Sequence, residues 1–198
     1  WWFCNMAEIT GRKQVILSTA HRLDLAVSLY EDLAPILKKR VNAKLMSSYG
    51  RNSVTSADLE TKWLVRAANN SVGHGLSVTL CVADEIWDIS RQVTDAGILP
   101  SQRAQRSPLL SCWSTAGTEH STAMMRWRDQ GLKSIDSGQP SSLYFAEWSP
   151  PDIDPMTPTA WAYANPGLGK ILTLSTLQAE AENPDRANFL RASCNLWV

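Results

Sequence analysis

The hydrophobic positions of this chain change their spacing along the sequence, and each spacing predicts a different element. Residues 15–18 (VILS) form a short apolar run, which is typical of a buried strand. The apolar side chains that follow recur at helical spacing, and basic residues come where this helix should end. The helical set is Leu25, Leu29, Leu33, Ile36 and Leu37, followed by Lys38, Lys39 and Arg40. A strand that leads into a helix is the basic unit of an α/β fold.

Further short apolar runs predict more strands of the same sheet. Residues 78–83 carry no charge and are rich in β-branched side chains, which is typical of a strand covered on both faces in a parallel sheet. Residues 109–113 predict a second buried strand, and residues 63–67 and 143–146 predict two more. Helices are predicted over residues 1–10, 119–131, 174–182 and 185–196, whereas residues 42–62 are polar and mixed and residues 86–106 form an irregular or helical excursion. The pattern favours an α/β fold with a mostly parallel sheet flanked by helices.

The character of the sequence changes after Pro150 and Pro151. Prolines and glycines then separate short segments, and the two predicted helices near the end follow them. We therefore expect residues 1–150 to form the sheet core and residues 151–198 to form a helical extension.

The amino-acid composition excludes only a few classes of function. The 198 residues include 19 Lys and Arg and 19 Asp and Glu, so the overall charge indicates neither a nucleic acid nor a membrane as partner. No apolar run approaches the roughly 20 residues of a membrane span. Four cysteines are widely scattered and three histidines lie far apart, without the spacing of a zinc site. We expect a reduced, intracellular protein without a structural metal.

Two polar segments follow predicted strands and are the candidates for chemistry. Asp84 and Glu85 come where the uncharged strand should end, and Ser114, Thr115, Ala116 and Gly117 follow the next buried strand. Ligands of open α/β sheets bind at the carboxyl ends of strands, and two acids there suit a metal ion and a water molecule. If the two strands are neighbours, both segments converge on one crevice. The alternative is that the acids begin a solvated loop and that a hydroxyl caps the next helix.

The sequence lacks the loops that usually hold phosphates. It contains neither a Gly-x-x-x-x-Gly-Lys-Ser/Thr loop nor a Gly-x-Gly-x-x-Gly loop, and no Gly-x-Ser-x-Gly elbow supports a hydrolase triad. His74 stands between two glycines, where a histidine could serve as a ligand or base but is more often only solvated.

An ordered set of segments resembles the ATPase domain of the tailed-phage terminase large subunit. The set is residues 15–21 (VILSTAH), 73–77 (GHGLS), 82–85 (VADE), 114–117 (STAG), 161–169 (WAYANPGLG), 189–191 (FLR) and 195–197 (NLW). The resemblance spans nearly the whole chain and implies a P-loop NTPase-like fold. It also implies that Asp84 is the metal-side aspartate of a Walker B pair and that Glu85 is the catalytic glutamate.

The resemblance assigns roles to the other segments as well. Ser114, Thr115, Ala116 and Gly117 match the motif that couples hydrolysis to movement, and Thr19, Ala20 and His21 match the segment beside the nucleotide. The implied cofactors are ATP and Mg²⁺. Terminase large subunits package double-stranded viral DNA into a capsid, work with a portal protein and a small subunit, and assemble as homo-oligomeric rings. The implied location is the host cytoplasm, for a protein encoded by a phage or prophage and not attached to a membrane.

The chain also departs from the family's pattern. The phosphate-binding Walker A loop should lie just before Trp1 and the nuclease domain should follow Val198, so we expect a fragment that hydrolyses ATP poorly by itself. His74 stands where the family often has arginine. Two alternatives stay open: a superfamily 2 helicase-like ATPase, which also has an Asp-Glu pair, and a noncatalytic assembly remnant of the same fold.

Overall fold

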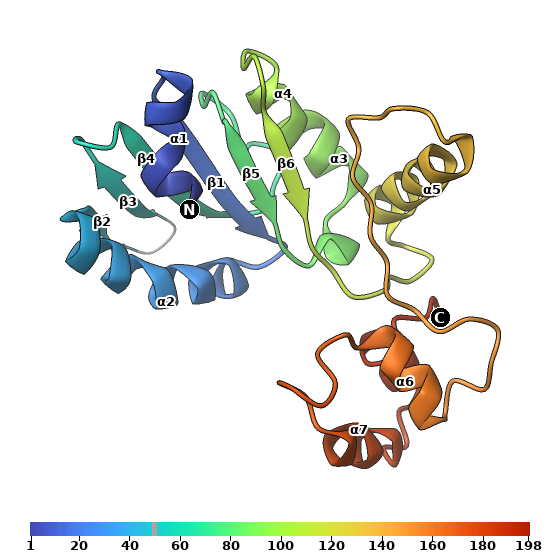
Figure 1. Ribbon diagram of the computed structural model, residues 1–198. Coiled ribbons are helices and arrows are strands. Elements are labelled where there is room, and N and C mark those ends of the chain that lie inside the picture. The colour runs from blue at the N-terminus through green and yellow to red at the C-terminus, as the bar shows by residue number, and fades with distance from the viewer. Residues whose placement is uncertain (49–50) are drawn as a thin grey trace. The chain divides into compact units, whose positions relative to one another are not determined.

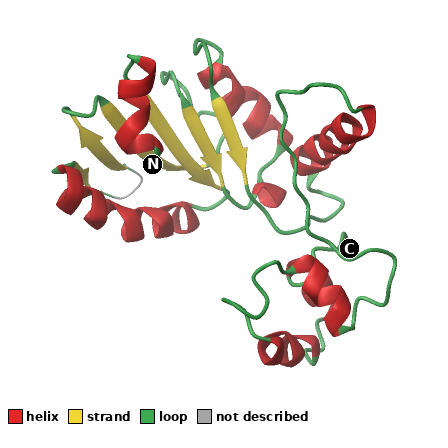
Figure 2. Cartoon of the chain, in the orientation of Figure 1, coloured by secondary structure: helices red, strands yellow, loops and turns green. Residues whose placement is uncertain are grey.

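The computed structural model describes residues 1–48 and 51–198, which form two compact units, Trp1–Trp113 and Ser114–Val198. The first unit contains the sheet, and the second is built of helices and long loops (Figures 1 and 2). The change of sequence character near residue 150 therefore lies inside the second unit and does not coincide with the boundary between the units. In the part of the chain that the structure describes, no helix is long and apolar enough to cross a membrane.

The first unit is organised around a six-stranded sheet of order β2-β3-β4-β1-β5-β6. Its strands are β1 (Gln14–Ala20), β2 (Lys44–Met46), β3 (Asn52–Ser56), β4 (Thr61–Ala67), β5 (Leu80–Ala83) and β6 (Leu109–Cys112). Neighbouring strands from β4 to β6 are parallel, and β3 is antiparallel to both of its neighbours. The predicted mostly parallel sheet is confirmed, and its central strand is β1, flanked by β4 and β5.

Helices α1 (Trp2–Thr10) and α2 (Leu23–Val41) pack on one face of this sheet (Figure 1). α1 ends at Gly11 and α2 ends at Asn42, and both end residues have the left-handed backbone that stops a helix. The core on this face includes Phe3, Ile16, Ala20, Ala26, Tyr30, Ala34, Val54, Trp63 and Val65. Alternate residues of β1 point to this face, which is why a strand in the middle of the sheet is apolar on both sides.

The other face of the sheet is covered by the turn between β4 and β5 and by the segment between β5 and β6. The segment between β5 and β6 contains η1 (Ile86–Asp88), α3 (Arg91–Val93), η2 (Thr94–Ile98) and α4 (Leu99–Gln102). The core between this layer and the sheet consists of Leu17, Leu64, Val72, Val78, Cys81 and Ile98. The approach is close at Gly73, where an added Cβ would lie 2.3 Å from the carbonyl oxygen of Gly97. Glycine is therefore required there by space.

The helix predicted from the leucine and isoleucine spacing is confirmed as α2, but most of those side chains are not buried. Leu25, Leu29, Leu33 and Ile36 are 39–54% exposed, only Leu37 packs against the core, and the buried face is Ala26, Tyr30 and Ala34. Two other predictions about the first unit were wrong in part. The polar region 42–62 contains β2 and β3, whose antiparallel pairing needs no long apolar run. β6 is half-exposed, because it pairs with β5 on one side and is the last strand of the sheet among the described residues.

The second unit contains α5 (Thr122–Ser137), α6 (Pro158–Ala164), α7 (Leu174–Ala181) and α8 (Arg186–Ala192). The side chains of Thr157, Thr173 and Asp185 accept hydrogen bonds from backbone N–H groups at the starts of α6, α7 and α8. Ala160, Trp161, Leu177, Phe189 and Cys194 form their common core. The strand predicted over residues 143–146 is absent, and these residues are an extended loop. The helix expected from residue 119 begins at Thr122, and α6 was not predicted.

Candidate nucleotide site at the carboxyl end of the sheet

The carboxyl ends of β1, β5 and β6 lie side by side. β1 and β5 are parallel with Thr19 opposite Ala83, and the backbone N–H of Asp84 donates to the carbonyl of Thr19 over 2.8 Å. β5 and β6 are also parallel, with Ala83 opposite Cys112. The expectation that the two strands before the polar segments are neighbours is therefore confirmed. Thr19, Ala20 and His21 end the strand beside the acid pair.

The acid pair has an unusual backbone. Glu85 has φ 51, in the left-handed region that residues other than glycine seldom adopt. Asp84 is exposed, and its Oδ1 accepts a hydrogen bond from the backbone N–H of Glu85 over 3.0 Å. Such a conformation costs on the order of 1–3 kcal/mol and concentrates at functional sites, so it is itself a reason to look for chemistry at Glu85.

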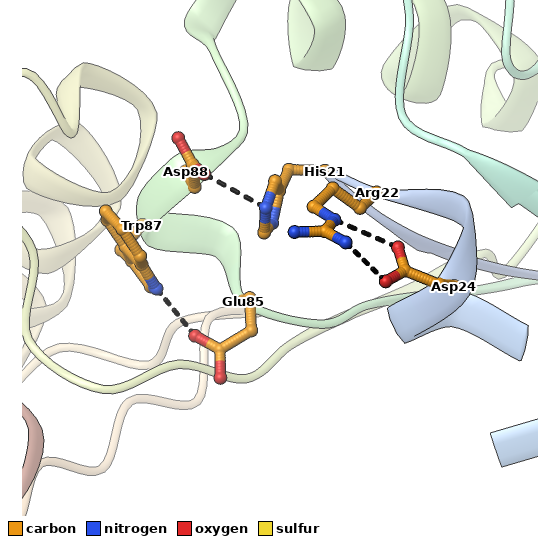
Figure 3. Close-up of polar contacts among 6 residues, drawn as sticks. All are labelled: His21, Arg22, Asp24, Glu85, Trp87 and Asp88. Carbon is orange, nitrogen blue, oxygen red and sulfur yellow. Dashed lines mark hydrogen bonds and ion pairs between the residues drawn. The ribbon is translucent and has the colours of Figure 1, made fainter. Parts of the chain in front are cut away.

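The Glu85 side chain is held by a tryptophan that sequence reasoning missed. The indole Nε1–H of Trp87 donates to Glu85 Oε2 over 2.6 Å, and η1 carries both Trp87 and Asp88 (Figure 3). Asp88 Oδ2 lies 3.2 Å from Nε2 of His21, and the rings of His21 and Trp87 are 6.5 Å apart between centroids. Residues 85–88 therefore connect the acid pair to the end of β1. Their closeness in the sequence was the only available signal.

Two buried polar atoms lie at the same carboxyl edge of the sheet, at the end of β1. Thr19 is 1% exposed, and its Oγ1 and the Nδ1 of His21 have no hydrogen-bond partner among the described residues. A buried polar group without a partner costs free energy, so each such group needs an explanation. The buried positions of Thr19 and Ala20 mean that a ligand at this edge would meet their backbone and the side chain of His21.

An open groove of about 630 Å³ begins beyond His21 and does not include the acid pair. Its lining residues are Arg22, Leu23, Asp24, Val27, Ser47, Ser48 and Asn52. Arg22 donates two hydrogen bonds to Asp24, over 3.0 and 2.6 Å (Figure 3). These bonds lower the pKa of Asp24 and raise the pKa of Arg22, so both side chains stay charged near neutral pH.

The segment Ser114–Gly117 belongs to the second unit and is held there by α8. Nη1 of Arg191 donates to Oγ1 of Thr115 over 3.3 Å and to the carbonyl oxygen of Ala116 over 3.4 Å. A Cβ on Gly117 would lie 2.4 Å from Oγ of Ser121, so the loop closes tightly before α5. Oγ of Ser121 also accepts a hydrogen bond from the backbone N–H of Thr118 over 2.9 Å. Arg191 was noted in the sequence only as part of the resemblance.

His74 does not join the acid pair in any contact of the structure's described part. It is exposed on the turn between β4 and β5, where its backbone N–H donates to the carbonyl oxygen of Ser71. Within residues 1–48 and 51–198, no group of three or more His, Cys, Asp or Glu side chains could hold a metal ion. Asp84 alone suits Mg²⁺ only in the manner of nucleotide sites, where one or two carboxylates, water and phosphate oxygens share the ion.

Comparison with known proteins gives a fold. No family model matches the chain, and no curated protein matches its sequence. Among solved structures, the HK97 bacteriophage large terminase superposes with a TM-score of 0.76 at 22% identity, covering 97% of this chain and 42% of its own. The chain has the fold of a large terminase ATPase domain.

Other large terminases give the same result. The ATPase domain of the Thermus phage P74-26 large terminase matches with a TM-score of 0.61 at 10% identity, over 97% of this chain and 80% of its own. A large terminase from a thermophilic bacteriophage, in complex with ADP, matches with a TM-score of 0.58 at 11% identity, over 96% of this chain. This chain spans less than half of the length of the HK97 and thermophilic-phage large terminases, 42% in each case. The helicase-like alternative gains no support from these comparisons.

Proposed function

We propose that this chain is part of the ATPase of a phage DNA-packaging motor, which uses ATP hydrolysis to move double-stranded DNA into a capsid. The observation that carries the proposal is the position of Asp84 and Glu85. They directly follow β5, which lies between β1 and β6, at the carboxyl edge where open α/β sheets bind ligands. The fold shared with large terminases supports it, although a fold alone does not fix an activity.

In this proposal Asp84 and Glu85 have different roles in ATP hydrolysis. Asp84 is exposed and would share a Mg²⁺ ion with the phosphates of ATP; that ion would neutralise charge on the transferred phosphoryl group. Glu85 would orient the attacking water and accept its proton through Oε1, since Oε2 accepts the hydrogen bond from Trp87. Thr19, Ala20 and His21 would lie beside the nucleotide, and Ser114–Gly117 would respond to the γ-phosphate.

The wider assignments follow from the same proposal. We infer that the chain works in the host cytoplasm, in a homo-oligomeric ring on a portal protein and together with a small subunit. The large terminase of a thermophilic bacteriophage has been solved with ADP, which supports a nucleotide as the ligand of this fold. The competing proposal of a noncatalytic assembly remnant predicts docking on partners without turnover.

Glu85→Gln tests the proposal in the complete reading frame that encodes the chain. Loss of a general base typically costs about 10²–10⁴ in rate, so we expect ATP turnover to fall by at least about 100-fold. Binding of a fluorescent ATP analogue should persist, because the amide keeps the size of the side chain. Turnover that is unchanged by Glu85→Gln would remove Glu85 as the base. A wild-type protein that binds partners but shows no turnover would favour the assembly remnant.

A further inference from the structure

The hydrogen bond between Trp87 and Glu85 is short and joins a neutral donor to a carboxylate. Nε1 of Trp87 lies 2.6 Å from Oε2 of Glu85, whereas hydrogen bonds from charged nitrogen donors to carboxylates are usually about 2.7–2.9 Å. Figure 3 shows the indole edge directed at one oxygen of the carboxylate, with the other oxygen turned away from the ring. One carboxylate oxygen is thus fixed by the protein.

Residues two apart do not ordinarily face each other in a helix. Here the left-handed backbone of Glu85, at φ 51, turns the chain just before η1 and brings the two side chains together. The strained backbone and the hydrogen bond therefore form one arrangement. A tryptophan that served only to fill the core would not need a strained glutamate beside it.

His21, which follows β1, lies beside the indole and pairs with the next residue, Asp88. Nε2 of His21 lies 3.2 Å from Oδ2 of Asp88, and the planes of the His21 and Trp87 rings are inclined by 51°. His21 follows the strand whose residue Thr19 accepts the backbone N–H of Asp84. The segment Thr19–His21 thus contacts residues 84–88 at two places, through the carbonyl of Thr19 at Asp84 and through His21 beside Trp87 and Asp88.

We propose that Trp87 is a positioning residue for Glu85 in ATP hydrolysis. The indole N–H holds Oε2, so that Oε1 is presented to the attacking water in one orientation. A free glutamate side chain has several rotamers, and fixing one of them before the reaction removes an entropy cost from the chemical step. This inference rests on the proposed function, since it needs Glu85 to be the base.

The test replaces the indole by rings that lack the N–H, in the complete reading frame. One variant is Trp87→Phe, and the second carries benzothienylalanine at position 87, which keeps the fused ring and has sulfur in place of the N–H. Loss of the fixed orientation should lower kcat by about 10-fold, with KM for ATP changed less than about 2-fold. Trp161→Phe is the matched control, because its indole donates over 2.9 Å to the carbonyl of Pro155 in the second unit. We expect kcat of this control to equal that of the wild type.

The outcomes separate this inference from the proposed function. If Glu85→Gln leaves turnover unchanged, the proposed function fails and the inference falls with it. If Glu85→Gln abolishes turnover but both position-87 variants keep the wild-type kcat, only the inference is overturned. It is also overturned if KM rises at constant kcat, which would make Trp87 a nucleotide contact, or if Trp161→Phe loses as much kcat. A loss of kcat at constant KM in the benzothienylalanine variant supports it even where Trp87→Phe does not fold.

Discussion

Two polar segments follow neighbouring parallel strands, and they are held in different ways. Asp84 and Glu85 are fixed by contacts within a few residues and by the adjacent strand β1. Thr115 and Ala116 are bound by Arg191, a side chain 75 or more residues further along. The first segment depends on the sheet, whereas the second depends on the C-terminal helices.

The proposed motor function would require these two kinds of support. Catalytic groups must be held within a fraction of an ångström, and strands and short-range hydrogen bonds provide that precision. A segment that responds to the γ-phosphate must instead be able to change position together with another element. The hydrogen bond from Arg191 of α8 to Thr115 connects the second segment to another element, as the proposed coupling role requires.

The largest difference between the two segments should appear in ATP turnover, when Asp84→Asn is compared with Thr115→Val. Asp84→Asn removes the negative charge that would hold Mg²⁺, so we expect ATP turnover to fall about 100-fold. Thr115→Val removes one hydroxyl that is 3.3 Å from Arg191 and should cost turnover less than about 5-fold. Single-turnover hydrolysis in the complete reading frame measures both. Equal losses would show that the second segment also takes part in the chemical step.

Arg191→Ala should give the next largest effect, on stability. It removes the two bonds to Thr115 and Ala116 and a third, over 3.1 Å, to Oδ1 of Asn188. The two longer bonds are weak, so we expect the free energy of unfolding to fall by about 1–2 kcal/mol. Urea unfolding followed by tryptophan fluorescence measures this change.

The matched control is Arg186→Ala, because Arg186 is exposed on the same helix. An exposed substitution of this kind should change the free energy of unfolding by less than about 0.5 kcal/mol. Hydrogen exchange adds a local measurement, and the amides of residues 115–117 should exchange faster in Arg191→Ala alone. Equal destabilisation by the two variants would mean that Arg191 does not hold this segment.

The sequence predicted the parts of the fold that depend on local pattern. The strands at β1, β4 and β5 were found because strands in the interior of a sheet that is covered on both faces form short apolar runs. The packed face of α2 was not found, because Ala26 and Ala34 carry less hydrophobic signal than the exposed leucines beside them. Ala26 and Ala34 are buried there beside Tyr30, whose ring lies 5.9 Å from that of Trp63 in β4.

The candidate site was predictable in its residue types but not in its supports. Asp84 and Glu85 follow an uncharged strand, so their position at the carboxyl edge could be inferred. Trp87 could not be assigned to Glu85, because residues two apart do not face each other in a helix and the left-handed backbone at Glu85 has no signal in the sequence. Arg191 could not be assigned to Thr115 either, since a contact across 76 residues has no local pattern.

The smallest expected effect is a difference in the rate of local unfolding between strand β5 and the region after α8. Alkylation of a buried thiol in each region measures it. Cys81 lies in β5, the strand that ends just before the acid pair, and Cys194 follows α8; both are 0% exposed. Burial raises the pKa of Cys194 to about 11 and raises that of Cys81 further. At about pH 8 both thiols are protonated in the folded state, so alkylation requires local opening.

Alkylation by iodoacetamide at about pH 8 should modify Cys194 about 10-fold faster than Cys81, because short helices open more readily than a strand that is hydrogen-bonded on both sides. Mass spectrometry of single-cysteine variants measures the two rates.

The contribution of Cys194 to folding stability depends on pH with a fixed sign. The folded pKa of Cys194 lies above its unfolded value, so the stability gained from the protonated thiol is present below about pH 9 and is lost as pH rises towards about 11. Cys81 reacting as fast as Cys194 would show that strand β5 opens as readily as the region after α8, and the contrast between a segment held by the sheet and one held by the C-terminal helices would then be lost.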